Sequence, residues 1–172
     1  MSLIKHIKKI FKYKIYNEQD LSNAIEDNNI KLVKEILKNL PNREFQYNYC
    51  TYSAIKNYTD IIKLLLKDSR CLPHNNLNEP LLKSIEYNNF ESFKLLIEDT
   101  RVLKTFNEQI IVDYCITYND IRALNYLFDV LDINSFISND YCPLQRALAK
   151  ENNDIITKIL HNKHLLIKNY TY

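Results

Sequence analysis

The chain has 172 residues, of which 46% are hydrophobic and 26% are charged, and its net charge is +2. This composition supports a folded core and excludes a disordered tail. The small net charge argues against a dedicated nucleic-acid binder. No apolar run approaches the roughly 18 residues that span a bilayer. The lysine-rich amino terminus does not resemble a secretory signal.

Residues 1–16 combine an apolar helical stripe with several lysines. The apolar positions are Leu3, Ile4, Ile7, Ile10 and Phe11, and the lysines are Lys5, Lys8, Lys9 and Lys12. We interpret this segment as a basic amphipathic helix that caps the first of the units described below. Two alternatives stay open. The helix could contact anionic lipid or nucleic acid, or it could be a nuclear-import signal.

A pattern then repeats five times between residues 17 and 165. A small residue recurs at Ala24, Ser53, Ser84, Cys115 and Ala147, with spacings of 29, 31, 31 and 32 by subtraction of residue numbers. Four residues later stand Asn28, Asn57, Asn88, Asn119 and Glu151. The chain has no glycine, and Asn is the other residue that best tolerates the left-handed conformation at a helix end. A fixed period of this size predicts a stack of helix–turn–helix units.

Each unit is predicted to contain two helices. The first helices are expected at 20–27, 49–56, 80–87, 111–118 and 143–150. After the turn, apolar doublets recur four residues apart, which is typical of a helical stripe. They place the second helices at 30–39, 59–68, 90–99, 121–130 and 153–162. Pro80 and Pro143 suit the first turn of a helix, whereas Pro41 and Pro73 fall between units, where helices stop.

The fifth unit carries the clearest resemblance to a known family. Cys142–Leu148 (CPLQRAL) resembles the ankyrin motif Thr-Pro-Leu-His-x-Ala-Ala, and Glu79–Ile85 (EPLLKSI) is a weaker copy. The Asn series occupies the ankyrin glycine position. The resemblance implies an all-α ankyrin-repeat solenoid of about five helix–turn–helix units with an N-terminal capping helix. It implies one domain over 1–172, with the cap at 1–16, the repeats at 17–165 and a C-terminal cap or tail at 166–172.

The chain departs from the family motif in two ways. The motif histidine is missing from every unit, and so is the glycine of the usual hairpin between units. The connecting segments are therefore expected to be irregular loops rather than β-hairpins. Two of them, Lys67–Cys71 and Glu98–Val102, resemble inter-repeat segments of ankyrin proteins from giant DNA viruses.

No catalytic constellation is recognisable, and we expect no enzymatic activity, cofactor, metal or small-molecule substrate. Without glycine, no glycine-rich phosphate loop can form. The Cys71–His74 and His161–His164 segments each offer a pair of ligands, but they belong to different units and lie too far apart to share an ion. The four cysteines lack zinc spacing and are interpreted as reduced thiols, which favours a cytoplasmic location.

The first helices carry a row of tyrosines and cations opposite the small residues. These predicted partner-binding residues, hereafter the tyrosine–cation row, are Tyr52, Lys56, Lys83, Tyr87, Tyr114, Tyr118, Arg146 and Lys150. Tyrosine and arginine are enriched at binding hot spots. Six members are expected to be largely solvent-accessible on the concave side, which ankyrin relatives use for binding: Tyr52, Tyr87, Tyr114, Tyr118, Arg146 and Lys150.

Two functional hypotheses follow. The first is a non-catalytic protein–protein interaction module, an ankyrin-type adaptor or effector. For a viral protein of this kind, the expected target is a host protein or a protein of a co-infecting virus, in the host cytoplasm. The alternative is an accessory protein that binds nucleic acid or anionic membrane through the basic N-terminal helix and the cations of the row. Salt dependence separates the two, because phosphate contacts release counterions.

Overall fold

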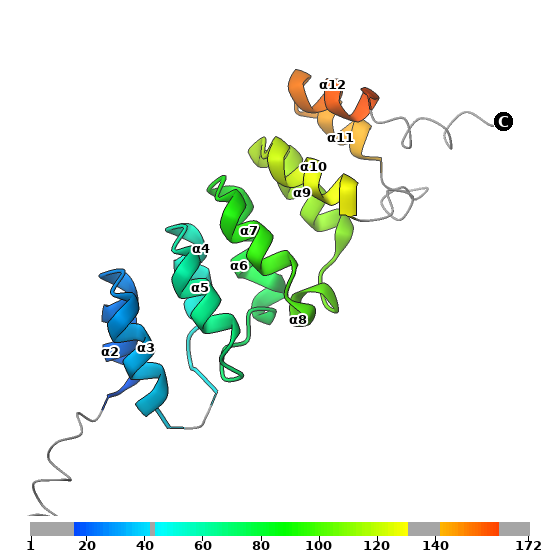
Figure 1. The fold of residues 1–172 in the computed structure, drawn as a ribbon. Helices are drawn as coiled ribbons and strands as arrows, with labels where there is room; N and C mark the ends of the chain where they lie inside the picture. Colours follow the sequence, from blue (N-terminus) through cyan, green and yellow to red (C-terminus); the bar gives the residue numbers. More distant parts are fainter. Residues whose placement is uncertain (1–15, 42–43, 131–141, 162–172) are drawn as a thin grey trace, which may run out of the picture.

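The computed structural model describes residues 16–41, 44–130 and 142–161. In these ranges the chain forms helices and no strand. The helices pair into five units that stack along one direction (Figure 1). The prediction of an all-α solenoid is therefore confirmed, and the described segments between units contain no strand.

The observed helices match the predicted ones closely. The first helices are α2 (Glu18–Glu26), α4 (Tyr49–Ile55), α6 (Asn75–Glu86), α9 (Glu108–Tyr118) and α11 (Pro143–Ala149). The second helices are α3 (Ile30–Asn39), α5 (Thr59–Leu66), α7 (Phe90–Ile97), α10 (Ile121–Val130) and α12 (Asn153–His161). One further short helix, α8 (Thr100–Leu103), follows α7 and was not predicted.

Helix α6 begins earlier than predicted because a left-handed turn precedes its regular part. Asn76, Leu77 and Asn78 have φ values of 54°, 58° and 62°. This conformation is costly for a leucine, and Leu77 is 80% exposed. The right-handed helix follows this turn, so that Pro80 lies in its first turn, as expected.

The turn between the two helices of each unit is left-handed at the predicted residue. The φ values of Asn28, Asn57, Asn88 and Asn119 are 50°, 56°, 54° and 56°, and that of Glu151 is 54°. In three units the next residue then caps the second helix. Its side-chain oxygen accepts a hydrogen bond from a backbone N–H of the first helical turn: Asn29 from Leu32, Asp120 from Ala123 and Asn152 from Ile155.

The core runs continuously through the stack. First helices pack on first helices and second helices on second helices, so the solenoid has two layers (Figure 1). The predicted small residues, Ala24, Ser53, Ser84, Cys115 and Ala147, are all buried. Their size allows close helix approach, and no unit buries its apolar stripe without a neighbour.

Two arginines join consecutive units among the first three units of the stack. Arg70 donates hydrogen bonds to the carbonyls of Leu37 and Leu40, at the end of α3, and Asp68 orients its guanidinium. Arg101 repeats the arrangement one unit later. It donates to the carbonyls of Leu66 and Cys71 at 2.8 and 2.9 Å, and Asp99 orients it. We call these two Asp-x-Arg pairs the arginine clamps, because they satisfy backbone carbonyls at and beyond the ends of the preceding helices.

The predicted caps lie outside the described residues, except for Tyr16. This residue is buried, and its hydroxyl donates to Glu35 of α3 at 2.6 Å. The predicted C-terminal cap or tail, 166–172, lies wholly outside. Among the described residues, no helix is both long and apolar enough to cross a membrane.

Candidate interaction surface

The tyrosine–cation row follows the first helices and their C-terminal caps from α4 to α11. Five of its members are exposed: Lys56, Tyr87, Tyr118, Arg146 and Lys150. Tyr87 is 51% exposed and Tyr118 is 37% exposed. These two rings therefore present apolar area and a hydroxyl to solvent, as a binding surface requires.

The expectation that Tyr52 and Tyr114 are largely accessible is wrong, because both are half-buried. Their rings pack against the hydrophobic core. The ring of Tyr52 also lies edge-on to that of Tyr58, with centroids 6.4 Å apart. The ring of Tyr114 lies 5.5 Å from that of Tyr118. These buried aromatic contacts hold the more exposed part of the row in place.

Most cations of the row already have an intramolecular partner. Lys83, which is half-buried, forms a 2.8 Å ion pair with Glu86, and this hydrogen bond raises the pKa of the Lys83 ammonium. Two guanidinium nitrogens of Arg146, Nε and Nη2, donate to the carboxylate of Asp113, at 3.1 and 3.0 Å. Lys56 lies over the ring of Tyr52 at 5.7 Å. The row therefore offers tyrosine surface more than free positive charge.

Carboxylates accompany the cations of the first-helix layer, and two of them, Glu86 and Asp113, pair with members of the row. Helix α2, which precedes it in the first-helix layer, carries Glu18, Asp20 and Glu26. Helix α9 begins with Glu108 and carries Asp113. Such mixed charge does not form the continuous basic track that a nucleic-acid backbone needs.

A small pocket next to Tyr52 was missed by the sequence analysis. It lies between α2 and α4 with a volume of about 150 Å³, and its lining includes Glu26, Tyr47, Tyr49 and Tyr52. Tyr47 is 66% exposed. The signal for this pocket was present in the spacing of Tyr47, Tyr49 and Tyr52. The sequence did not show that Glu26 lies beside these tyrosines, because this depends on how α2 packs against α4.

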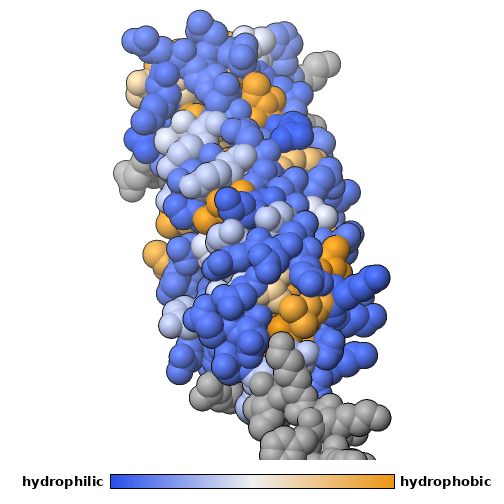
Figure 2. Space-filling view, turned by 90° about the vertical axis from the view of Figure 1, so that its left-hand side faces the viewer, coloured by the Kyte–Doolittle hydropathy of each residue, from blue (hydrophilic) through white to orange (hydrophobic). Residues whose placement is uncertain are grey.

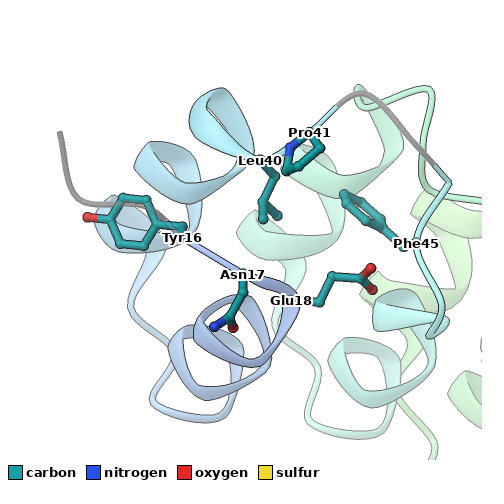
Figure 3. A pocket seen from close by; sticks show the side chains of 6 residues that line it. All are labelled: Tyr16, Asn17, Glu18, Leu40, Pro41 and Phe45. Atoms are coloured by element: carbon teal, nitrogen blue, oxygen red, sulfur yellow. The ribbon is translucent and has the colours of Figure 1, made fainter. Parts of the chain in front are cut away.

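A second hollow, of about 90 Å³, lies where α2 begins and α3 ends, and Phe45 from the following segment forms one wall (Figure 3). Glu18 lines it, but Oε2 of Glu18 already accepts hydrogen bonds from the Gln46 backbone and the Tyr49 hydroxyl, at 2.9 and 3.3 Å. Burial and this carboxylate raise the pKa of Tyr49. The hollow is therefore part of the junction between units one and two.

One further face of the molecule lacks a broad apolar patch. The face in Figure 2 is mostly hydrophilic, and its apolar residues form separate groups. Within the described ranges, no cluster of three or more His, Cys, Asp or Glu residues could hold a metal ion. Cys50, Cys71 and Cys115 are buried thiols, and Cys142 is half-buried.

The stacked helix pairs with left-handed turns define a solenoid repeat protein. A family model described as ankyrin repeats (3 copies) matches residues 21–107, which is just over half of the chain. The chain therefore belongs to the ankyrin-repeat family, whose repeats are generally protein–protein interaction modules. No curated protein matches the chain. The match covers units one to three and ends before α9.

Proposed function

We propose that this protein is a non-catalytic interaction module that binds a protein partner through its first-helix face, the concave side in the family. The observation that carries the proposal is that the first-helix layer presents two exposed tyrosines, Tyr87 and Tyr118, and also contains an aromatic pocket. Both are sites where a partner can bury apolar area and still find hydrogen bonds.

The chemistry of this face favours a partner segment with a basic or amide-bearing side chain at the first two units. The pocket at Tyr47 and Tyr52 combines aromatic walls with the carboxylate of Glu26. Aromatic faces attract cations, and a carboxylate adds directional hydrogen bonds. We further propose that the protein is an adaptor or effector that acts in the cytoplasm. Its four free thiols support this location, and the resemblance of the inter-unit segments to those of viral ankyrin proteins supports this role.

The test is affinity capture from a native lysate with the wild type and a Tyr87→Ala, Tyr118→Ala double variant. Both side chains are exposed, so the variant should unfold within about 0.5 kcal/mol of the wild type. Binding of a captured partner should weaken by more than about 1 kcal/mol. A Thr157→Ala, Lys158→Ala variant changes exposed positions of α12 and serves as a control. Unchanged retention of every partner by the tyrosine variant would refute the proposal.

The alternative of a nucleic-acid or membrane binder is separated from this one by salt. A phosphate-based complex would weaken steeply and log-linearly as salt rises. The proposed complex should depend on salt much less steeply, because Lys83 and Arg146 are already paired within the chain and a contact with Glu26 adds a single ion pair.

A further inference from the structure

An open groove lies on the opposite layer of the solenoid, between α3 and α5, which are neighbours in the stack (Figure 1). Its volume is about 210 Å³. The lining residues are Lys34, Leu37, Lys38, Leu64, Lys67 and Asp68. Two lysines of α3 and Lys67, the C-cap of α5, thus line one hollow together with two leucines, away from the tyrosine–cation row.

The three lysines are exposed, and among the described residues none of them has an ion-pair or hydrogen-bond partner. The groups that would ordinarily neutralise them are taken by Arg70. Both carboxylate oxygens of Asp68 bind the guanidinium, which lowers the pKa of that carboxyl. The carbonyls of Leu37 and Leu40 at the end of α3 accept from the same guanidinium. The one carboxylate in the lining is thus already paired with Arg70, and the three lysines that line the hollow have no ion-pair partner among the described residues.

We propose that this groove binds a compact, multiply charged phosphate-type anion. Lysine ammonium groups are flexible point charges with three donors each, which suits the several oxygens of a phosphate. A single carboxylate is better matched by an arginine fork, and the fork of Arg70 is already occupied. The two leucines of the lining strengthen the attraction between the lysines and an anion, because charges interact more strongly beside a low-dielectric surface.

The charge pattern also limits the size of the ligand. One unit later, between α5 and α7, Lys63 and Lys67 occupy the positions that Lys34 and Lys38 hold in the groove. Glu98 occupies the third position, which Lys67 holds in the groove between α3 and α5. Lys63 is paired with Asp60 at 3.1 Å, and Glu98 accepts from the Tyr126 hydroxyl. The positive surface therefore stops after one groove, whereas a nucleic acid would need it to continue.

The test is a calorimetric titration of the full chain with inorganic tripolyphosphate at low and physiological salt. The decisive variant is Lys67→Glu, which gives the groove the two lysines and one glutamate that occupy the equivalent positions one unit later. Its affinity should be lower by about tenfold or more, since it removes one cationic contact and adds a repulsive charge. Lys38→Gln should weaken binding in the same direction by a smaller factor.

The matched control is Lys94→Glu on α7, which makes the same change in net charge at an exposed lysine outside the groove. It should alter the affinity by no more than about twofold, because exposed charges at a distance are screened. Equal losses in Lys67→Glu and Lys94→Glu, or no binding by the wild type, would overturn the proposal. Tighter binding of a single-stranded oligonucleotide, with the same dependence on Lys67, would overturn the assignment of a compact ligand.

Discussion

Two junctions of the solenoid each use an arginine, and they differ in what that arginine binds. Between units two and three, Arg101 is 28% exposed and donates to two backbone carbonyls of the preceding unit. Between units four and five, Arg146 is 51% exposed and pairs with the side chain of Asp113. The first arginine satisfies backbone carbonyls at and beyond the end of a helix, whereas the second adds a surface ion pair. The same residue type should therefore have very different energetic weight.

The difference follows the family match. Both arginine clamps lie within residues 21–107, the part that the ankyrin model covers. In the last unit, α11 buries Pro143 and Ala147, and α12 buries Ile155 and Ile159. The junctions of the inner units thus rest on guanidinium–carbonyl contacts as well as on packing. We expect unfolding to begin at the C-terminal end, because the last unit has one neighbour and an exposed ion pair at its junction, whereas unit one is held by an arginine clamp.

The largest effect is expected for Arg101→Ala. The variant leaves the carbonyls of Leu66 and Cys71 and the carboxylate of Asp99 without their donor, so stability should fall by about 2 kcal/mol. Arg101→Lys should recover little, because an ammonium cannot replace the fork. Urea denaturation measures both values. A loss below about 0.5 kcal/mol for Arg101→Ala would show that the clamps are surface ion pairs like that of Arg146.

Asp120 lies at the junction between units three and four, and replacing it should raise the stability of the protein rather than lower it. Its Oδ2 is buried without a hydrogen-bond partner among the described residues, and burial raises the pKa of its carboxyl. At the equivalent position, Asn89 donates through Nδ2 to the carbonyls of Ala54 and Ile55, both at 2.8 Å. Asp120→Asn should therefore stabilise the protein at neutral pH by about 1 kcal/mol.

The pH dependence of Asp120 provides an internal check. Because the folded pKa is raised above the unfolded one, folding takes up a proton between the two pKa values, and the wild type gains stability as pH falls through that range. The advantage of Asp120→Asn should shrink over the same range. Chemical denaturation at a series of pH values measures it. An advantage that stays constant or grows on acidification would mean that Asp120 is stabilised as a carboxylate.

Asn57 tests whether the left-handed asparagines also join units. Its Oδ1 accepts a 2.7 Å hydrogen bond from the buried hydroxyl of Ser92 in the next unit. Asn28 has the same backbone conformation, but its side chain forms no hydrogen bond in the described ranges. Asn57→Gly should therefore cost about 1 kcal/mol, whereas Asn28→Gly should be close to neutral. Equal melting temperatures for the two variants would show that only the backbone conformation matters at both sites.

The backbone of the repeats could be predicted because local residue types determine it. Asparagine tolerates the left-handed turn, small residues permit close helix packing, and Pro143 starts a helix. The clamps could not be predicted in this way, because Arg70 and Arg101 reach carbonyls about one repeat away in sequence. Only the recurrence of Asp-x-Arg at a spacing of one unit hinted at them.

The candidate surface was predictable in outline but not in exposure. Helical spacing placed Tyr87 and Tyr118 on the outer side of the first helices, where they are exposed. The same spacing placed Tyr52 and Tyr114 there, but these rings fold back onto the core. Periodicity gives the direction of a Cβ atom, whereas a tyrosine ring can turn toward any apolar neighbour within its reach.

The smallest effect is expected for Arg146→Ala. Its ion pair with Asp113 is solvent-exposed, so the free energy of unfolding should fall by less than about 0.5 kcal/mol, and less at high salt. Asp113→Ala should cost about as much as Arg146→Ala, and the double variant should cost little more than either single variant. Urea denaturation of the four proteins at two salt concentrations measures the coupling. If Arg146→Ala proved as destabilising as Arg101→Ala, the exposed pair would join the last unit as firmly as the clamps join the inner ones. The difference between the two junctions would then lie in packing alone.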